Sequence, residues 1–157
     1  MFAINANAIQ EIRTTDSISA AVSEISAAGI EKIRHRLKRG RRSFHVVNGC
    51  THFGLATSHP TQVVVLRNSR IAVLVDTIER METISILMAL PPGFSGPERA
   101  WYRGITLIGG NVVPVVNPSG FLTEQEMAAL DAAAGEADVA LRESGDSENQ
   151  PSAEPAR

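Results

Sequence analysis

The chain has 157 residues, 43% of them hydrophobic and 20% charged, which suits one globular domain with a substantial core. A single cysteine, Cys50, excludes a scaffold built on internal disulfides. The apolar runs fall far short of the roughly 20 residues that a membrane span needs, and residues 1–11 lack the basic flank of a signal peptide. We therefore expect a soluble, cytoplasmic protein without membrane insertion.

The net charge of −2 hides a separation of opposite charges along the chain. Residues 30–42 contain seven basic residues and one acidic residue, whereas residues 124–157 contain nine acidic residues and two basic ones. Such a separation indicates either an internal electrostatic contact or a basic surface that faces a partner. Two merely solvated faces explain it equally well.

The first third of the chain mixes strand and helix patterns. Residues 2–13 alternate loosely and predict two short strands joined by a turn. In residues 30–39 the apolar positions recur at helical spacing, and Gly40 follows as a helix stop, so this basic segment is predicted to be a helix. Residues 44–48 are rich in β-formers and predict a strand that ends at the turn Asn48-Gly49.

Two hairpins are predicted in the middle of the chain. The first joins the Val- and Ile-rich runs 62–66 and 70–75, and the second joins 104–108 to 111–116 through Gly109-Gly110. A further strand is predicted at 83–88.

The chain ends in a predicted helix and an acidic tail. Thr123 and Glu126 have the spacing of a capping box, and an apolar stripe continues to about residue 141, so a helix is predicted at 123–142. Residues 143–157 contain no aliphatic residue larger than alanine and are predicted to be disordered.

A short sequence repeat suggests that the domain contains two related β-units. Val-Val-Asn occurs at 46–48 and again at 115–117, each time with a phenylalanine a few residues later. The alternation along the strands leaves open which face is buried. If Val113 and Val115 belong to the core, Val112 and Val116 face outward.

These segments carry a family resemblance. Residues 62–122 resemble the second half of the CheW-like domain, the adaptor fold of bacterial chemosensory systems, and residues 2–13, 39–40 and 45–48 resemble parts of its first half. The stretches that match best are Val64-Val65-Leu66, Ile71–Met81, Tyr102–Ile105 and Gly110–Pro118. The chain departs from the family pattern by lacking the first strand and by having Asn48 and Asn117 where the family has aspartate.

The resemblance implies a mainly β fold with two small five-stranded β-barrels of the Src-homology-3 type. These would occupy about residues 2–60 and 61–123 of one domain, 2–123, together with an inserted basic helix and the C-terminal helix. The missing first strand would leave an open sheet edge, which favours self-association.

The resemblance also implies a function: a non-catalytic adaptor in signal transduction, with neither a metal nor another cofactor. It would couple the cytoplasmic tip of a chemoreceptor to the regulatory domain of a CheA-type histidine kinase, and it would be recruited to membrane-bound receptor arrays. By resemblance, the receptor-binding residues are Arg39, Gly40, Val46 and Asn48. The corresponding kinase-binding residues are Gly104, Ile105, Pro114 and Val116.

Three alternatives to this adaptor come from other features. Cys50 and His52, with His45 or His59, could form a thiol or metal site, although their spacing matches no known ligand set and an inert thiol is favoured. The basic run 30–42 could bind nucleic acid or another anionic partner, but it lacks interleaved aromatic residues for base contacts. The chain could also be a degenerate CheW-like module that works by oligomerising.

Overall fold

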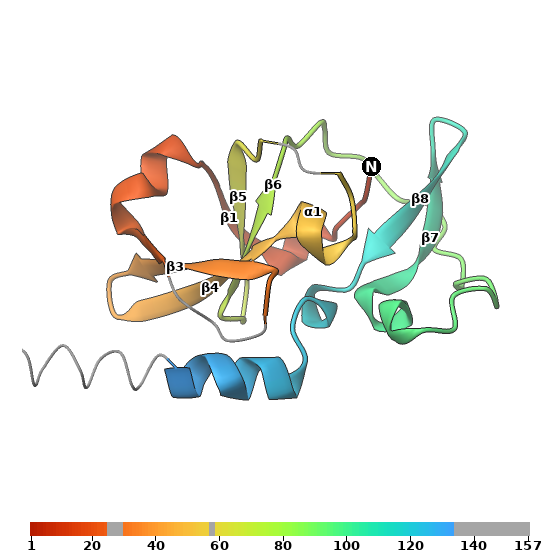
Figure 1. The fold of residues 1–157 in the computed structure, drawn as a ribbon. Coiled ribbons are helices and arrows are strands. Elements are labelled where there is room, and N and C mark those ends of the chain that lie inside the picture. The colour runs from red at the N-terminus through yellow and green to blue at the C-terminus, as the bar shows by residue number, and fades with distance from the viewer. Residues whose placement is uncertain (25–29, 57–58, 134–157) are drawn as a thin grey trace, which may run out of the picture. The chain divides into compact units, whose positions relative to one another are not determined.

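The computed structural model describes residues 1–24, 30–56 and 59–133 (Figure 1). The chain divides into two units, Met1–Thr123 and Glu124–Arg157. The first unit is mainly β-structure, as predicted. In the second unit residues 124–133 are helical, and the remainder of the predicted helix and the acidic tail lie outside the described residues. None of the helices in the described part of the chain combines the length and the apolar character that crossing a membrane requires.

Six strands of the first unit form one sheet, in which only β4 and β6 run parallel (Figure 1). In spatial order they are β1 (Ile9–Thr14), β5 (Gln62–Leu66), β6 (Ile71–Val75), β4 (Arg42–Asn48), β3 (Ile33–Arg39) and β2 (Val22–Glu24). The sheet curls, so that Glu11 on β1 comes into ion-pair contact with Arg39 on β3, although three strands lie between β1 and β3 in the spatial order. The 3-10 helix η2 (Asp16–Ala21) packs against both of these strands.

The predicted helix at residues 30–39 is wrong, because residues 33–39 form β3. Ile33 and Leu37 are buried, and their spacing of four residues places them on one face of either a helix or a strand. Backbone pairing decides between the two, since β3 is hydrogen-bonded to β2 on one side and to β4 on the other.

The curled sheet encloses an aliphatic core. Val63 and Val65 of β5, Ala72 of β6 and Val46 of β4 are buried together in it. Ile18 of η2 closes the core, and Leu37 and Phe44 complete it. The low aromatic content therefore matches an interior made of Val, Ile and Leu.

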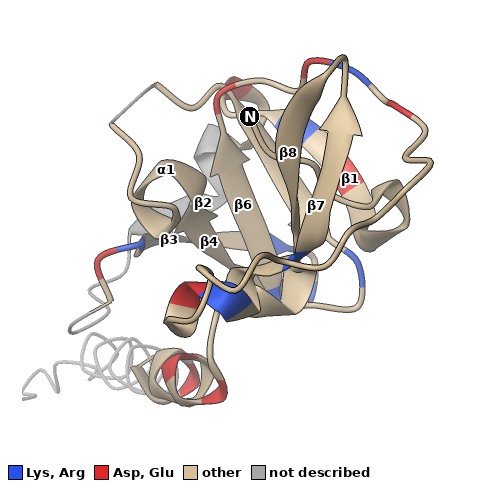
Figure 2. Cartoon of the chain, turned by 90° about the vertical axis from the view of Figure 1, so that its right-hand side faces the viewer, with Lys and Arg blue, Asp and Glu red and all other residues tan. Residues whose placement is uncertain are grey.

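The second sheet is a hairpin of β7 (Tyr102–Ile108) and β8 (Asn111–Val116), which contain one charged residue, Arg103 (Figure 2). Gly109 and Gly110 have φ values of 56° and 81°, as a type I′ turn requires, so the predicted hairpin is confirmed. Isolated bridges add Ala3 beside β8 and Met88 beside β7. The strand predicted at 83–88 is thus reduced to one bridge. The strands described do not confirm two barrels of five strands each.

Further short helices precede β1, lie between later strands and follow β8. They are η1 (Ala6–Ala8), α1 (Gly49–His52), η3 (Pro97–Trp101) and η4 (Pro118–Gly120). The helices α1 and η3 bring aromatic residues together at the junction of the two sheets.

This aromatic cluster contains six of the seven aromatic residues of the chain. Its members are Phe2, Phe53, Phe94, Trp101, Tyr102 and Phe121. Phe53, which follows α1, stacks on Phe2 with ring centroids 4.3 Å apart and on Tyr102 of β7 at 5.8 Å. Burial, and then the negative charge of Glu98, raise the pKa of Tyr102 above its ordinary value, so its ring stays neutral in the cluster. The cluster therefore joins the β7–β8 hairpin to the six-stranded sheet.

Gly104 provides a test of how β7 packs against the segment that precedes it. A Cβ atom at Gly104 would overlap the carbonyl oxygen of Met88, whereas Gly93 has open space around it. Gly104→Ala is expected to lower the free energy of unfolding by about 1–3 kcal/mol, because the backbone must move apart. Gly93→Ala should change it by less than about 0.5 kcal/mol. Urea denaturation measures both, and equal stability of the two variants would contradict the packing described.

Candidate functional site

The Val-Val-Asn repeat has the same local structure in both places. Asn48 ends β4, and its side-chain oxygen accepts a hydrogen bond from the backbone N–H of Thr51 (3.2 Å) at the start of α1. Asn117 follows β8, and its side-chain oxygen accepts from the N–H of Ser119 (3.3 Å) at the start of η4. Each asparagine thus caps a short helix after a strand. The two Val-Val-Asn segments therefore share one local structure, a strand followed by a short helix with an asparagine cap.

The neighbouring strands of the two units also correspond. β4 has an antiparallel neighbour, β3, and a parallel one, β6. β8 has an antiparallel neighbour, β7, and a parallel partner in the single residue Ala3. The N–H of Ala3 donates to the carbonyl of Pro114 (2.9 Å), and the N–H of Val116 donates to Ala3 (2.7 Å). The strand pairing around β8 therefore repeats that around β4 in reduced form, with the single residue Ala3 in place of β6.

The four residues predicted on β7 and β8 differ in their exposure. Gly104 is buried, and Val116 is only 4% exposed, so neither can provide much contact surface. Ile105 and Pro114 are directly opposite each other in the register and are half-buried. The exposed apolar residues of the hairpin are Leu107 (59%) and Val112 (62%), which also pair across the strands.

Sequence analysis did not identify Leu107, although the alternation along residues 104–108 contains the signal. Thr106 is 1% exposed, so its two neighbours in the strand point to the opposite side. Val113 and Val115 are buried as expected, whereas Val116, which the same alternation placed outside, is buried as well. Val116 lies where the N-terminal segment pairs with β8, since its backbone N–H donates to the carbonyl of Ala3.

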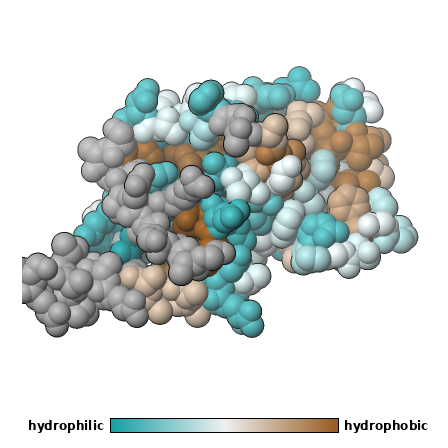
Figure 3. Space-filling view, viewed as in Figure 1, coloured by the Kyte–Doolittle hydropathy of each residue, from teal (hydrophilic) through white to brown (hydrophobic). Residues whose placement is uncertain are grey.

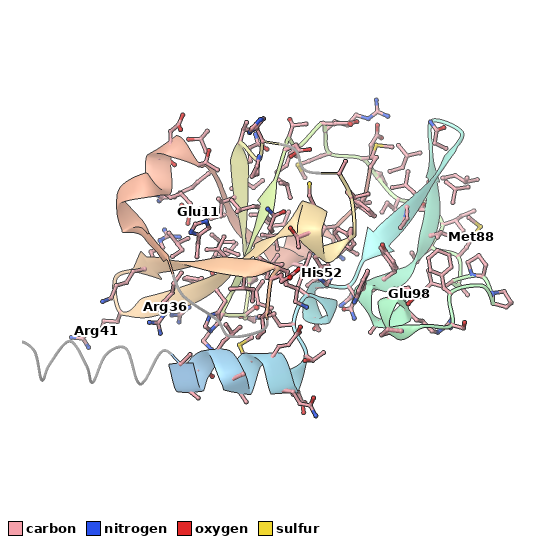
Figure 4. The ribbon with its side chains drawn as sticks, in the orientation of Figure 1. Glu11, Arg36, Arg41, His52, Met88 and Glu98 are labelled. Carbon is pink, nitrogen blue, oxygen red and sulfur yellow. The ribbon has the colours of Figure 1, made fainter. Side chains whose placement is uncertain are left out.

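The segment 84–88 extends this apolar surface beside β7. Met88 and Ile105 exchange two backbone hydrogen bonds of 2.8 and 2.9 Å, and the hydroxyl of Thr106 donates to the carbonyl of Ile86 at 2.7 Å. These bonds hold the segment along β7, and Met88 lies beside that strand in Figure 4. Ile86 and Leu87 are nevertheless 67% and 52% exposed.

We call this surface the apolar face; in Figure 3 hydrophobic surface gathers at the end of the first unit that carries β7 and β8. The apolar face comprises Ile84, Ile86, Met88, Leu107 and Val112. Large side chains that gather in this way on a folded protein are typical of a protein-binding surface.

The other four predicted residues are spread along the β3–β4 hairpin. Arg39 and Gly40 lie at its turn, whereas Asn48 lies six residues further along β4 than Arg42, roughly 20 Å away at the rise of a strand. Val46 is 2% exposed and belongs to the core. The structure therefore leaves Arg39 and Gly40 as the exposed part of this set.

The turn of this hairpin carries a cluster of positive charge, which we call the basic tip: Lys38, Arg39, Arg41 and Arg42. All four residues are exposed, and Arg41 is at the outer end of the hairpin in Figure 4. Gly40 has a φ of 56°, which allows the two-residue turn between the paired residues Arg39 and Arg42. Because a helix was predicted here, the sequence did not reveal that these charges meet at a turn.

The alternative thiol or metal site is not assembled. Cys50 and His52 lie on the helix α1 rather than on a strand, and residues two apart on a helix do not face each other. The ring of His52 packs inside the aromatic cluster, 4.5 Å from the ring of Trp101 and 5.1 Å from that of Phe121. Within residues 1–24, 30–56 and 59–133, no group of three His, Cys, Asp or Glu residues is arranged to hold a metal ion.

Comparison with known proteins gives two positive findings. The family model of the CheW-like domain matches residues 1–126. Among solved structures, the chain is similar to the scaffolding protein TtCheW from Thermoanaerobacter tengcongensis, with a TM-score of 0.61 and 13% sequence identity. The match covers 74% of this chain and 80% of that protein, and at this identity it shows a shared fold. A search of curated proteins found no significant match.

The two asparagines should respond differently to aspartate. Asn117 also donates a hydrogen bond from its Nδ2 to the carbonyl of Ala100 (3.0 Å), so a carboxylate there would face an oxygen atom. Asn117→Asp is therefore expected to lower the free energy of unfolding by about 1–3 kcal/mol. Asn48→Asp keeps the acceptor for Thr51 and should change it by less than about 0.5 kcal/mol.

Thermal and urea unfolding of the two variants at pH 7 measure this difference, with Asn48→Ala and Asn117→Ala as controls for loss of the cap. Each alanine variant is expected to be less stable by about 1 kcal/mol. A larger effect of aspartate at residue 48 than at residue 117 would contradict the assignment of the two side chains.

Proposed function

The chain belongs to the CheW-like domain family, and on this premise we propose that it is a non-catalytic adaptor of a chemosensory signalling system. It couples the cytoplasmic tip of a chemoreceptor to the regulatory domain of a CheA-type histidine kinase. An adaptor must bind two partners at once and therefore needs two separate surfaces. The observation that supports this function best is the apolar face, because it exposes large hydrophobic side chains on a unit that already has its own core.

The apolar face is the proposed kinase-binding surface. Burying such side chains in an interface contributes roughly 25 cal/mol for each Å² of apolar surface removed from water. Ile105 and Pro114 lie on the same two strands, and they provide the half-buried part of the contact. Gly104 and Val116 act indirectly, since Gly104 permits the close approach of the segment that ends at Met88 and Val116 anchors the N-terminal segment.

The hairpin end that carries Arg39 and Gly40 is the proposed receptor-binding surface. Val46 supports the strand from the core, and Asn48 fixes the direction of the chain at the far end of that strand. An adaptor with these partners works in the cytoplasm, at the membrane-bound arrays in which the receptors gather.

Self-association is a second candidate function, and one observation favours it. β1 is an edge strand of the six-stranded sheet, and its Ile12 is 47% exposed. An apolar residue on an open edge can promote pairing with a second copy. Sedimentation velocity distinguishes the two functions, because an adaptor of the proposed kind binds the kinase domain as a monomer.

Charge placed on the apolar face tests the adaptor. Leu107→Glu and Val112→Glu are each expected to weaken binding to a CheA regulatory domain from the same organism by at least about tenfold, because a carboxylate would be buried in the interface. Both residues are exposed, so the fold should tolerate the changes. Isothermal titration calorimetry at two salt concentrations gives the dissociation constants.

Two variants serve as controls for this experiment. Leu55→Glu introduces the same charge at an apolar residue that is 49% exposed in the other β-unit, and Cys50→Ala removes the only thiol. Both should bind as the unmodified protein does. Unchanged kinase binding by folded Leu107→Glu and Val112→Glu would rule out the proposed surface, and no binding by any form would rule out the function.

A further inference from the structure

We propose that the basic tip recognises an acidic segment of the receptor and that Glu11 competes with this segment for Arg39. The inference rests on the proposed function, and it adds the chemistry of the partner and a built-in competitor. It follows from the density of charge at the hairpin turn, from the position of the turn beyond the neighbouring strands, and from the ion pair that Arg39 already makes.

The basic tip extends beyond both strands that flank the hairpin. The pairing of β2 with β3 ends at Leu37, and the pairing of β6 with β4 begins at His45. Residues 38–43 are therefore flanked by no other strand in the described part of the chain, and they form a two-stranded projection. Four cations on six residues thus stand where a partner can approach from either side.

The two faces of the projection carry different cations. Arg39 and Arg42 are paired across the strands, so their side chains lie on the same face as the neighbouring pair Leu37 and Phe44. Lys38 is paired with Ser43 on the opposite face. Arg41 occupies the turn between them. A carboxylate that contacts the turn can therefore reach arginine side chains from two strands.

The ion pair of Glu11 shows that the basic tip can bind a carboxylate. The Glu11 carboxylate forms ion pairs with Arg39 and with Arg13, its neighbour on β1. Among the described residues, no carboxylate lies in ion-pair contact with Lys38, Arg41 or Arg42. An incoming acidic segment would bind these three cations directly and would share or displace Glu11 at Arg39. Arginine suits this role, because its planar guanidinium binds carboxylates in a bidentate manner.

The composition of the basic tip favours an acidic protein segment over the other anionic partners. Residues 38–42 include no aromatic side chain on which a nucleotide base could stack. They include no apolar side chain that could enter a lipid bilayer, as membrane-binding segments usually provide. A compact group of carboxylates on a receptor helix matches a projection of this size and charge.

The experiment measures binding of a receptor cytoplasmic fragment from the same organism at 50 mM and at 300 mM salt. Arg41→Glu and Arg42→Glu are each expected to weaken binding about five- to tenfold at low salt, and the loss should shrink at high salt through screening. Glu11→Gln should strengthen binding about two- to threefold, because it removes the competing charge and preserves the shape of the side chain. Arg80→Glu makes the same charge change at an exposed arginine outside the basic tip and should stay within about twofold of the unmodified protein.

The comparison of Arg41→Glu and Arg42→Glu with Arg80→Glu separates a local contact from a general effect of net charge, because all three substitutions change the net charge equally. Weaker binding by Glu11→Gln, or equal losses in Arg41→Glu and Arg80→Glu, would overturn the inference. The same variants are also tested with phosphatidylglycerol vesicles and with a 20-base-pair DNA duplex. Arginine variants that bind the receptor fragment normally but lose binding to the vesicles or to the DNA would also overturn the inference.

Kinase binding distinguishes the failure of this inference from the failure of the proposed function. The basic-tip variants should bind the CheA regulatory domain as the unmodified protein does, since they leave the apolar face intact. If kinase binding persists and the receptor contact ignores the basic tip, the adaptor function remains and the inference is wrong. If no form binds the kinase domain, the function itself fails.

Discussion

The aromatic cluster is the interaction on which the second β-unit depends. A two-stranded hairpin is at best marginally stable in water, and within the described residues β7 and β8 have only single-residue bridges on their outer edges. Phe53 supplies the missing contact by stacking on Phe2 and on Tyr102, so that three distant parts of the chain meet. Because Tyr102 remains neutral there, this contact is made by packing rather than by charge.

The same local unit, used twice, produces two different surfaces because its surroundings differ. In the six-stranded sheet both faces of β4 are covered, and Phe44 to Val47 are all buried. At the turn end of β8 only one face is covered, so Val113 is buried while Val112 is exposed. The proposed receptor-binding surface in the first β-unit is therefore a charged turn, and the proposed kinase-binding surface in the second β-unit is an apolar strand face. This division suits an adaptor that must keep two partners apart.

The outcome for residues 30–39 shows where local pattern reaches its limit. The spacing of Ile33 and Leu37 is shared by helices and strands, and only the strands on both sides of β3 select the extended form. The consequence for the charge distribution is large, because a helix would have spread the positive charges along its length. The strand instead ends in a turn that places Lys38, Arg39, Arg41 and Arg42 together.

Several features of this protein are determined by the sequence itself. The hairpin turn at Gly109-Gly110 and the asparagine that ends each Val-Val-Asn run depend on residues that are neighbours in the chain. Burial is different, since Val116 and Val112 look alike in the sequence, and yet Val116 is 4% exposed in the folded structure and Val112 is 62% exposed. The ion pair of Glu11 with Arg39 likewise joins residues that only the curl of the sheet brings together. Local geometry follows from residues that are adjacent in the chain. Exposure and charge pairing follow from contacts between segments that are remote along the chain, and such contacts arise only in the folded structure.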